Sequence, residues 1–178
     1  MRVCLPVGRG LLKALLNYLV DLCLLRAGPQ DLPGSNLLLV LFTLLNVLAG
    51  VVMITGARLG LSAAIAESLF EAALMLSALH LGLKLRNRLP RFQQAATALM
   101  GSSLLLGLLA LPLVALSNRS ESLVAGLLLL LLMVWSMVVL GHILRHTFDV
   151  TFHFGLGLAV LYTLLAWNLT FMLFPMVN

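Results

Sequence analysis

The chain has 178 residues, of which 62% are hydrophobic and only 10% are charged. One soluble core cannot bury that much apolar surface, so a soluble globular protein is excluded and lipid is the expected partner for the rest. The 11 lysines and arginines outnumber the 6 acidic residues, but they lie in a few short connections. That distribution is typical of membrane topology signals and not of a nucleic-acid-binding surface, so no nucleic-acid partner is expected.

Residues 9–25 are predicted to form the first helix. Lys13, Asn17 and Asp21 recur every four residues among leucines, a pattern typical of a helix with one narrow polar stripe. Such a helix lies at the headgroup level with its leucines in the acyl region, or it forms a poor sixth span. Its charged residues favour the interfacial placement. Two prolines and two glycines in residues 26–35 then end the helix and turn the chain, so residues 1–35 are assigned as a cytoplasmic amphipathic segment and loop.

Cys4 and Cys23 both lie in this amino-terminal segment. They have neither the Cys-x-x-Cys spacing nor a neighbouring histidine cluster that a metal or redox site would require. Both are expected to be free thiols.

Five later stretches have the ~20 predominantly apolar residues that a membrane-spanning helix needs. They cover about residues 36–56, 61–83, 94–116, 123–143 and 152–174. The connections between them, including 84–91 and 145–149, are too short to fold independently. Residues 36–178 are therefore predicted to be one five-span transmembrane domain. The predicted fold class is an all-α polytopic transmembrane helix bundle, preceded by an amphipathic interfacial helix.

The basic residues predict the orientation of this bundle. Nine of the eleven fall in the amino-terminal segment and in the connections after the second and fourth spans, whereas the opposite connections hold only Arg58 and Arg119. The positive-inside rule therefore places the amino terminus in the cytoplasm and the carboxyl terminus outside. Spans of low charge joined by short loops favour a bacterial inner membrane.

Glu67 and Glu71 lie one helical turn apart in the second span and share a face. An ionised acid at mid-membrane depth costs about 3 kcal/mol, so at least one of the pair is expected to carry a proton. Asn46, at a similar depth in the first span, is predicted to meet Glu71 across the hairpin. These residues are the candidate intramembrane polar site.

Two interpretations of this site are open. The acids are a proton or cation site, or they hydrogen-bond to Asn46, Thr43 or a backbone carbonyl and thereby fix the contact with another helix. The second is favoured, because the sequence has no internal repeat and only Pro112 interrupts a span, near its outer end.

His142, His146, Asp149 and His153 would line one face of an unbroken helix, which is a surface able to bind metal or haem. An unbroken helix would fuse the fourth and fifth spans, however. His142 and His146 are therefore placed in the solvated headgroup zone, and no metal site or cofactor is predicted. His80, alone near the end of the second span, is assigned a structural or interfacial role.

Small residues that let helices approach closely recur in four places. They are Gly56 with Gly60, Ala73 with Ser77, Gly101 with Gly107, and Gly155 with Gly157.

The layout as a whole resembles that of the Yip (Ypt-interacting protein) family and its small bacterial relatives. Its features are an amphipathic amino-terminal segment, five closely spaced spans and a carboxyl terminus just beyond the last span. The resemblance implies a non-enzymatic role in membrane organisation or protein partnering. It transfers no site residues to this chain.

No phosphate-binding loop, nucleophile elbow or cysteine-pair metal motif is present, so the chain is not expected to be an enzyme. The leading hypothesis is a non-catalytic accessory subunit, assembly factor or scaffold. Its expected partners are the lipid bilayer and other membrane helices, or a second copy of the chain. The alternative is a small oligomeric proton-linked transporter or channel that uses Glu67 and Glu71.

Overall fold

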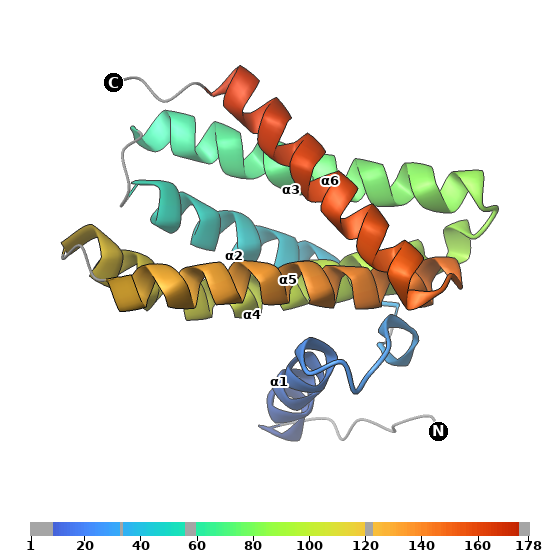
Figure 1. The fold of residues 1–178 in the computed structure, drawn as a ribbon. Coiled ribbons are helices and arrows are strands. Elements are labelled where there is room, and N and C mark those ends of the chain that lie inside the picture. The colour runs from blue at the N-terminus through green and yellow to red at the C-terminus, as the bar shows by residue number, and fades with distance from the viewer. Residues whose placement is uncertain (1–8, 33, 56–59, 120–122, 175–178) are drawn as a thin grey trace.

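A computed structural model describes residues 9–32, 34–55, 60–119 and 123–174, and all the regular structure in these residues is helical. Five long helices form a bundle, and a shorter helix lies on its flank (Figure 1). In chain order the elements are α1 (Arg9–Cys23), η1 (Pro29–Asp31), α2 (Asn36–Thr55), α3 (Leu61–Leu85), η2 (Leu89–Arg91), α4 (Phe92–Arg119), α5 (Leu123–Phe148) and α6 (Phe152–Leu173). The predicted all-α bundle is confirmed.

Helices α2 to α6 are the five described helices that are long and apolar enough to cross a membrane. Large apolar side chains cover their outer surfaces; Leu37, Leu123 and Met172, for example, are all highly exposed. Exposure on this scale needs lipid to cover it. The protein is therefore a multi-pass integral membrane protein, as predicted.

At one end of the bundle the helices run further than predicted. This end, which carries Arg86, Arg88, Arg91 and Arg145, is called the basic end below. Helix α5 continues to Phe148, so most of the connection predicted at 145–149 is helical, and residues 149–151 alone separate α5 from α6. Asp149 (φ 51°) supplies the left-handed residue that ends α5, and the amide of Val150 donates back to the carbonyl of Arg145 at 3.1 Å. Such a Schellman end lets a single residue reverse the chain.

The carboxylate of Asp149 also accepts hydrogen bonds from Arg88 and, at 3.0 Å, from Arg91. This contact ties the α3–α4 connection to the α5–α6 connection. The two basic connections therefore lie at the same end of the bundle, as the charge distribution requires. Because all three groups are partly exposed, the ion pairs contribute about 1 kcal/mol or less each.

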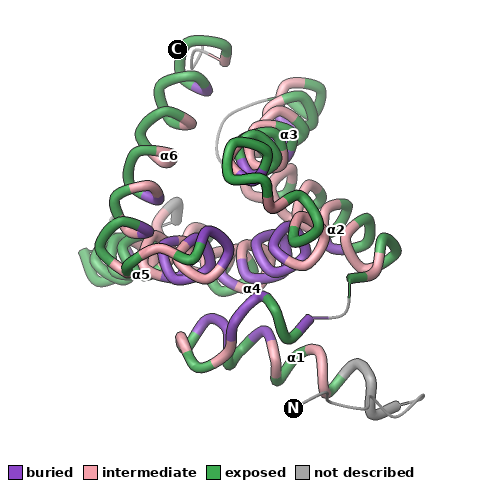
Figure 2. The backbone as a smooth tube through the Cα atoms, turned by 90° about the vertical axis from the view of Figure 1, so that its right-hand side faces the viewer, coloured by how far each residue is buried: buried purple, intermediate pink, exposed green. Residues whose placement is uncertain are grey.

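Helix α1 crosses the flank of the bundle instead of running alongside the spans (Figures 1 and 2). Its predicted polar stripe is confirmed, since Lys13, Asn17 and Asp21 are all exposed while Leu19 is buried against α4. Leu19 lies beside Gly101, about 14 Å along α4 from its start at the basic end. Helix α1 is not one of the described helices that are long and apolar enough to span.

Glycines bring α5 and α6 into backbone contact where they cross. A Cβ atom added to Gly155 would lie 2.6 Å from the carbonyl oxygen of Gly141, and one added to Gly141 would lie 2.9 Å from the Cα of Leu156. The prediction of close approach at Gly155 is therefore confirmed. It is wrong for Gly157, where a Cβ would meet nothing within 4 Å. Ala73 and Ser77 are exposed, and residues 56–59 lie outside the described residues.

Replacing Gly155 by alanine is expected to force α6 away from α5, because backbone atoms cannot yield as a flexible side chain can. We expect Gly155→Ala to destabilise the protein by about 1–3 kcal/mol, as overpacking typically does. Gly157→Ala is the matched control and should be neutral or stabilise by up to ~1 kcal/mol, since alanine is the better helix former. Thermal unfolding in detergent, followed by tryptophan fluorescence, measures both. Equal midpoints for the two variants would contradict the close packing.

Candidate intramembrane site

Glu71 faces an open cavity among the five spans. Two adjoining hollows, of about 590 and 350 Å³, share the Glu71 side chain. Together they are called the polar chamber below. Both hollows are lined by Glu71, Met75, Ser103, Met133, Tyr162, Thr163 and Trp167. These shared residues come from α3, α4, α5 and α6, and Asn46 and Met53 of α2 line one hollow each, so the chamber lies among the five spans.

The packing of α3 explains why Glu71 points into this chamber. Ala64, Ser68 and Ala72 form the buried face of α3. Ser68 lies against Gly50 of α2, where a Cβ would come within 2.8 Å of the Ser68 hydroxyl oxygen. Small residues thus hold α2 and α3 close together, and the larger side chain of Glu71 is left on the side turned toward α6.

Asn46 and Glu71 line the same hollow, in keeping with the predicted proximity. The hydrogen bonds differ from those predicted, however. The Asn46 amide donates to the carbonyl of Met100 at 3.4 Å, and the Thr43 hydroxyl donates to Leu39 at 2.8 Å. Among the described residues, Glu71 has no hydrogen-bond partner, and its side chain is exposed to the chamber.

The two acids differ in their surroundings. Glu67 is half-buried one turn further from the basic end, and it is not one of the residues that line the polar chamber. Glu71 is therefore the acid that another group can reach through the chamber.

Toward the basic end, a second cavity of about 390 Å³ adjoins the polar chamber. Its walls are almost entirely aliphatic and aromatic, and Arg86 lies at its end; it is called the apolar chamber below. Met75 and Tyr162 line both chambers. The polar lining therefore stops at about the level of Tyr162.

The sequence did not identify Ser103, Tyr162 and Thr163 as members of this site. In the sequence, these three residues differ from their neighbours only in being polar side chains within mainly apolar spans. Periodicity indicates which face of each helix they occupy, but not which helices are neighbours. That information requires the tertiary contacts.

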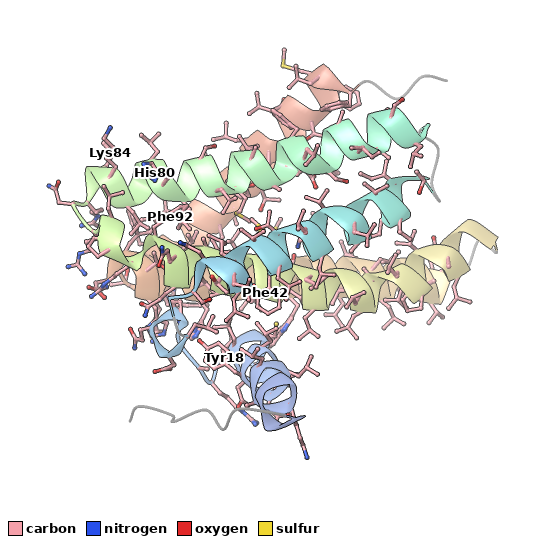
Figure 3. The ribbon with its side chains drawn as sticks, turned by 180° about the vertical axis from the view of Figure 1, so that it is seen from behind. Tyr18, Phe42, His80, Lys84 and Phe92 are labelled. Atoms are coloured by element: carbon pink, nitrogen blue, oxygen red, sulfur yellow. The ribbon has the colours of Figure 1, made fainter. Side chains whose placement is uncertain are left out.

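The histidines do not assemble into a metal site. His142 and His146 stack edge to face with their ring centroids 4.7 Å apart, but α5 ends at Phe148 and His153 is exposed on α6. Within the described residues, no three histidine, cysteine or acidic side chains are grouped closely enough to hold a metal ion. His80 packs edge-on against Phe92 with centroids 5.4 Å apart, and Lys84 follows it one turn later (Figure 3).

The placement of His142 in a solvated headgroup zone is wrong. Only 5% of its surface is exposed, and its Nε2 donates to the carbonyl of Ala27 at 3.0 Å. Two further side chains donate to the same segment: the Trp135 indole donates to the carbonyl of Cys23 at 3.2 Å, and the Tyr18 hydroxyl donates to that of Gly28. The residues after α1 thus form a strap, residues 24–32, that is fastened to the bundle largely through α5.

Two side chains beside the strap, Tyr18 and Cys23, have raised pKa values. Burial, and secondly the nearby carboxylate of Asp31, raise the pKa of Tyr18. Burial alone raises the pKa of Cys23 to about 11. Cys23 is a free thiol, as predicted, whereas Cys4 lies outside the described residues.

Comparison of the chain with protein-family models, with curated proteins and with solved structures finds no match.

Cys23 gives a direct measure of whether α1 and the strap are docked. In a Cys4→Ser background, Cys23 should react very slowly with a water-soluble maleimide at pH 7.5, because it is buried and almost wholly protonated. Gly101→Leu should speed the reaction at least about tenfold, since even a Cβ at this position comes within 2.6 Å of Leu19. Gly107→Leu is the matched control, because a Cβ there meets nothing within 4 Å. Rapid labelling of the parent protein would show that the strap is not docked.

Proposed function

We propose that this protein is a non-catalytic component of a membrane assembly, an accessory subunit, assembly factor or scaffold, that binds a helix of another membrane protein at the polar chamber. The observation that carries the proposal is the Glu71 carboxyl, which is exposed inside the membrane region and has no hydrogen-bond partner among the described residues. A polar group in hydrocarbon without a partner is costly. A polar side chain of a second helix is the partner that removes this cost.

The arrangement of α6 supports this proposal. Helix α6 packs against α5 at Gly141 and Gly155, and its far end meets α3, where the ring centroids of Phe174 and Phe70 lie 6.0 Å apart. The polar chamber lies among α2 to α6. Trp167, which lines this chamber and is 69% exposed, offers a large contact surface for an entering helix.

The hydroxyl groups near Glu71 support a non-catalytic role. Ser102 donates to the carbonyl of Leu99 at 3.0 Å, Ser136 to that of Met133 at 2.7 Å and Thr163 to that of Ala159 at 2.8 Å. Each of these three hydroxyls therefore already donates to a carbonyl of its own helix.

A small oligomeric proton-linked transporter or channel is the second candidate, and the gathering of polar side chains around Glu71 favours it. The apolar chamber weighs against it. Between Tyr162 and Arg86 the cavity walls offer almost no group that relays a proton to the basic end. A scaffold needs no such path.

We further propose that the basic end lies in the cytoplasm of a bacterial cell and that the bundle belongs to the inner membrane. The charge distribution supports this orientation, since nine of the eleven basic residues fall in segments assigned to that side. The likeness of the layout to Yip proteins, whose role is non-enzymatic, supports the same class of function.

A photoreactive phenylalanine analogue at Trp167 should capture a discrete membrane-protein partner in cells. Because an interhelical hydrogen bond contributes about 0.6–1.7 kcal/mol, Glu71→Leu should reduce the adduct by about three- to eighteenfold. Glu71→Gln, which keeps the hydrogen-bonding ability, and Glu67→Leu should both retain it. The same probe at Leu44, an exposed residue of α2 away from the chamber, is the control for non-specific capture. Equal adducts in Glu71→Leu and the parent would remove Glu71 from the docking site.

Purified protein in liposomes should not dissipate an imposed pH gradient, because the apolar chamber separates Glu71 from the basic end. A fluorescent pH indicator inside the vesicles measures this. Flux in the parent that disappears in Glu71→Gln and persists in Glu67→Gln would establish the transporter and overturn the scaffold.

A further inference from the structure

The outward face of α1 carries three exposed polar side chains. Lys13, Asn17 and Asp21 occupy successive turns and are exposed, while Leu19 and Leu22 on the opposite face are buried against the bundle. None of the three side chains has an ion pair or hydrogen bond within the described residues. The stripe therefore points away from the bundle with its hydrogen-bonding capacity unused.

Apolar side chains share this outward face. Val20 and Leu24 are 42% and 46% exposed, and the neighbouring Leu16 is 47% exposed. A face turned only to water is mainly polar, and a face turned only to lipid is mainly apolar. Lysine can extend its ammonium group to the headgroups, but the short side chains of Asn17 and Asp21 cannot. The mixture suits contact with another helix at the depth at which Leu19 meets Gly101.

The order of charges along the stripe identifies that helix. From the amino to the carboxyl end, the stripe runs from a basic residue (Lys13) through an amide (Asn17) to an acidic residue (Asp21). In the reverse direction it runs acidic, amide, basic, so a reversed copy presents an opposite charge to each charged residue. Two copies of α1 packed antiparallel about Asn17 would place each Lys13 opposite Asp21 of the other copy, with the two Asn17 amides facing each other. We propose that the protein forms a two-fold symmetric dimer through this antiparallel pairing of α1.

The orientation of α1 in the bundle permits this pairing and excludes the parallel one. Two copies inserted in the same direction are related by a rotation about the membrane normal. Because α1 crosses the span axes, that rotation reverses its direction (Figure 2). Helix α1 is also the outermost described element on its side of the bundle, so a second copy can approach it (Figures 1 and 2). The two-fold symmetry and the order of charges therefore both favour the antiparallel pairing of α1.

Charge reversal with rescue tests the pairing. Donor- and acceptor-labelled protein is reconstituted together into liposomes, and energy transfer is measured as lipid is added to dilute the protein. Lys13→Asp and Asp21→Lys each place like charges together at both ends of the contact, so each should weaken the dimer at least about tenfold. The double variant Lys13→Asp/Asp21→Lys restores both pairs and should recover the parent affinity. Lys84→Asp, at an exposed position of α3, is the control and should change nothing.

A disulfide at the symmetry axis tests the geometry separately. In a Cys4→Ser/Cys23→Ala background, Asn17→Cys should crosslink to a dimer on mild oxidation, since the two copies of this residue face each other. Leu44→Cys, equally accessible from the lipid, should not. A protein that stays monomeric at every dilution, a double variant no closer to the parent than the single variants, or an Asn17→Cys that does not crosslink would overturn the dimer. Glu71→Leu should leave the dimer intact. The dimer and the proposed docking site at Glu71 are therefore tested separately.

Discussion

Three backbone carbonyl groups, at Cys23 where α1 ends and at Ala27 and Gly28 in the strap, have no partner within a helix. Each accepts a hydrogen bond from a side chain: Trp135, His142 and Tyr18, respectively. Non-helical backbone at membrane depth is tolerated only where protein supplies such donors. The requirement explains why α5, otherwise a run of aliphatic residues, carries an indole and a buried imidazole on the side facing the strap.

The position of α1 follows from this anchoring. The helix ends in a Schellman motif in which Leu25 adopts a left-handed conformation (φ 64°). The backbone amide of Arg26 donates to the backbone carbonyl of Asp21 at 2.8 Å. A leucine in that conformation is strained by about 1–2 kcal/mol, so the contacts of the strap must hold it there. Fixed at its carboxyl end by α5 and at Leu19 by the small surface of Gly101, α1 can only lie across the spans.

The sequence predicts the parts of this fold that depend on local pattern. Apolar runs of the length of a bilayer identified all five spans, and the four-residue spacing of Lys13, Asn17 and Asp21 identified the exposed stripe of α1. Helix ends were harder to predict, because Asp149 stops α5 through its backbone conformation and not through proline or glycine. The roles of His142 and Trp135 were beyond prediction, since their partners lie more than a hundred residues away along the chain. Likewise, the depth of Glu71 was predictable, but the chamber it faces is built from five helices.

The polar groups that this chain leaves without partners are informative about how it works. The carbonyls of Cys23, Ala27 and Gly28 each receive a donor from within the chain, whereas the buried hydroxyls of Ser68 and Thr170 have no hydrogen-bond partner among the described residues. Glu71 and the outward stripe of α1 are left open in the described structure, one among α2 to α6 and the other on the opposite flank of the bundle. The apolar chamber separates Glu71 from the basic end. The two open polar features therefore lie on different sides of the bundle, and each is available to a group from outside the described chain.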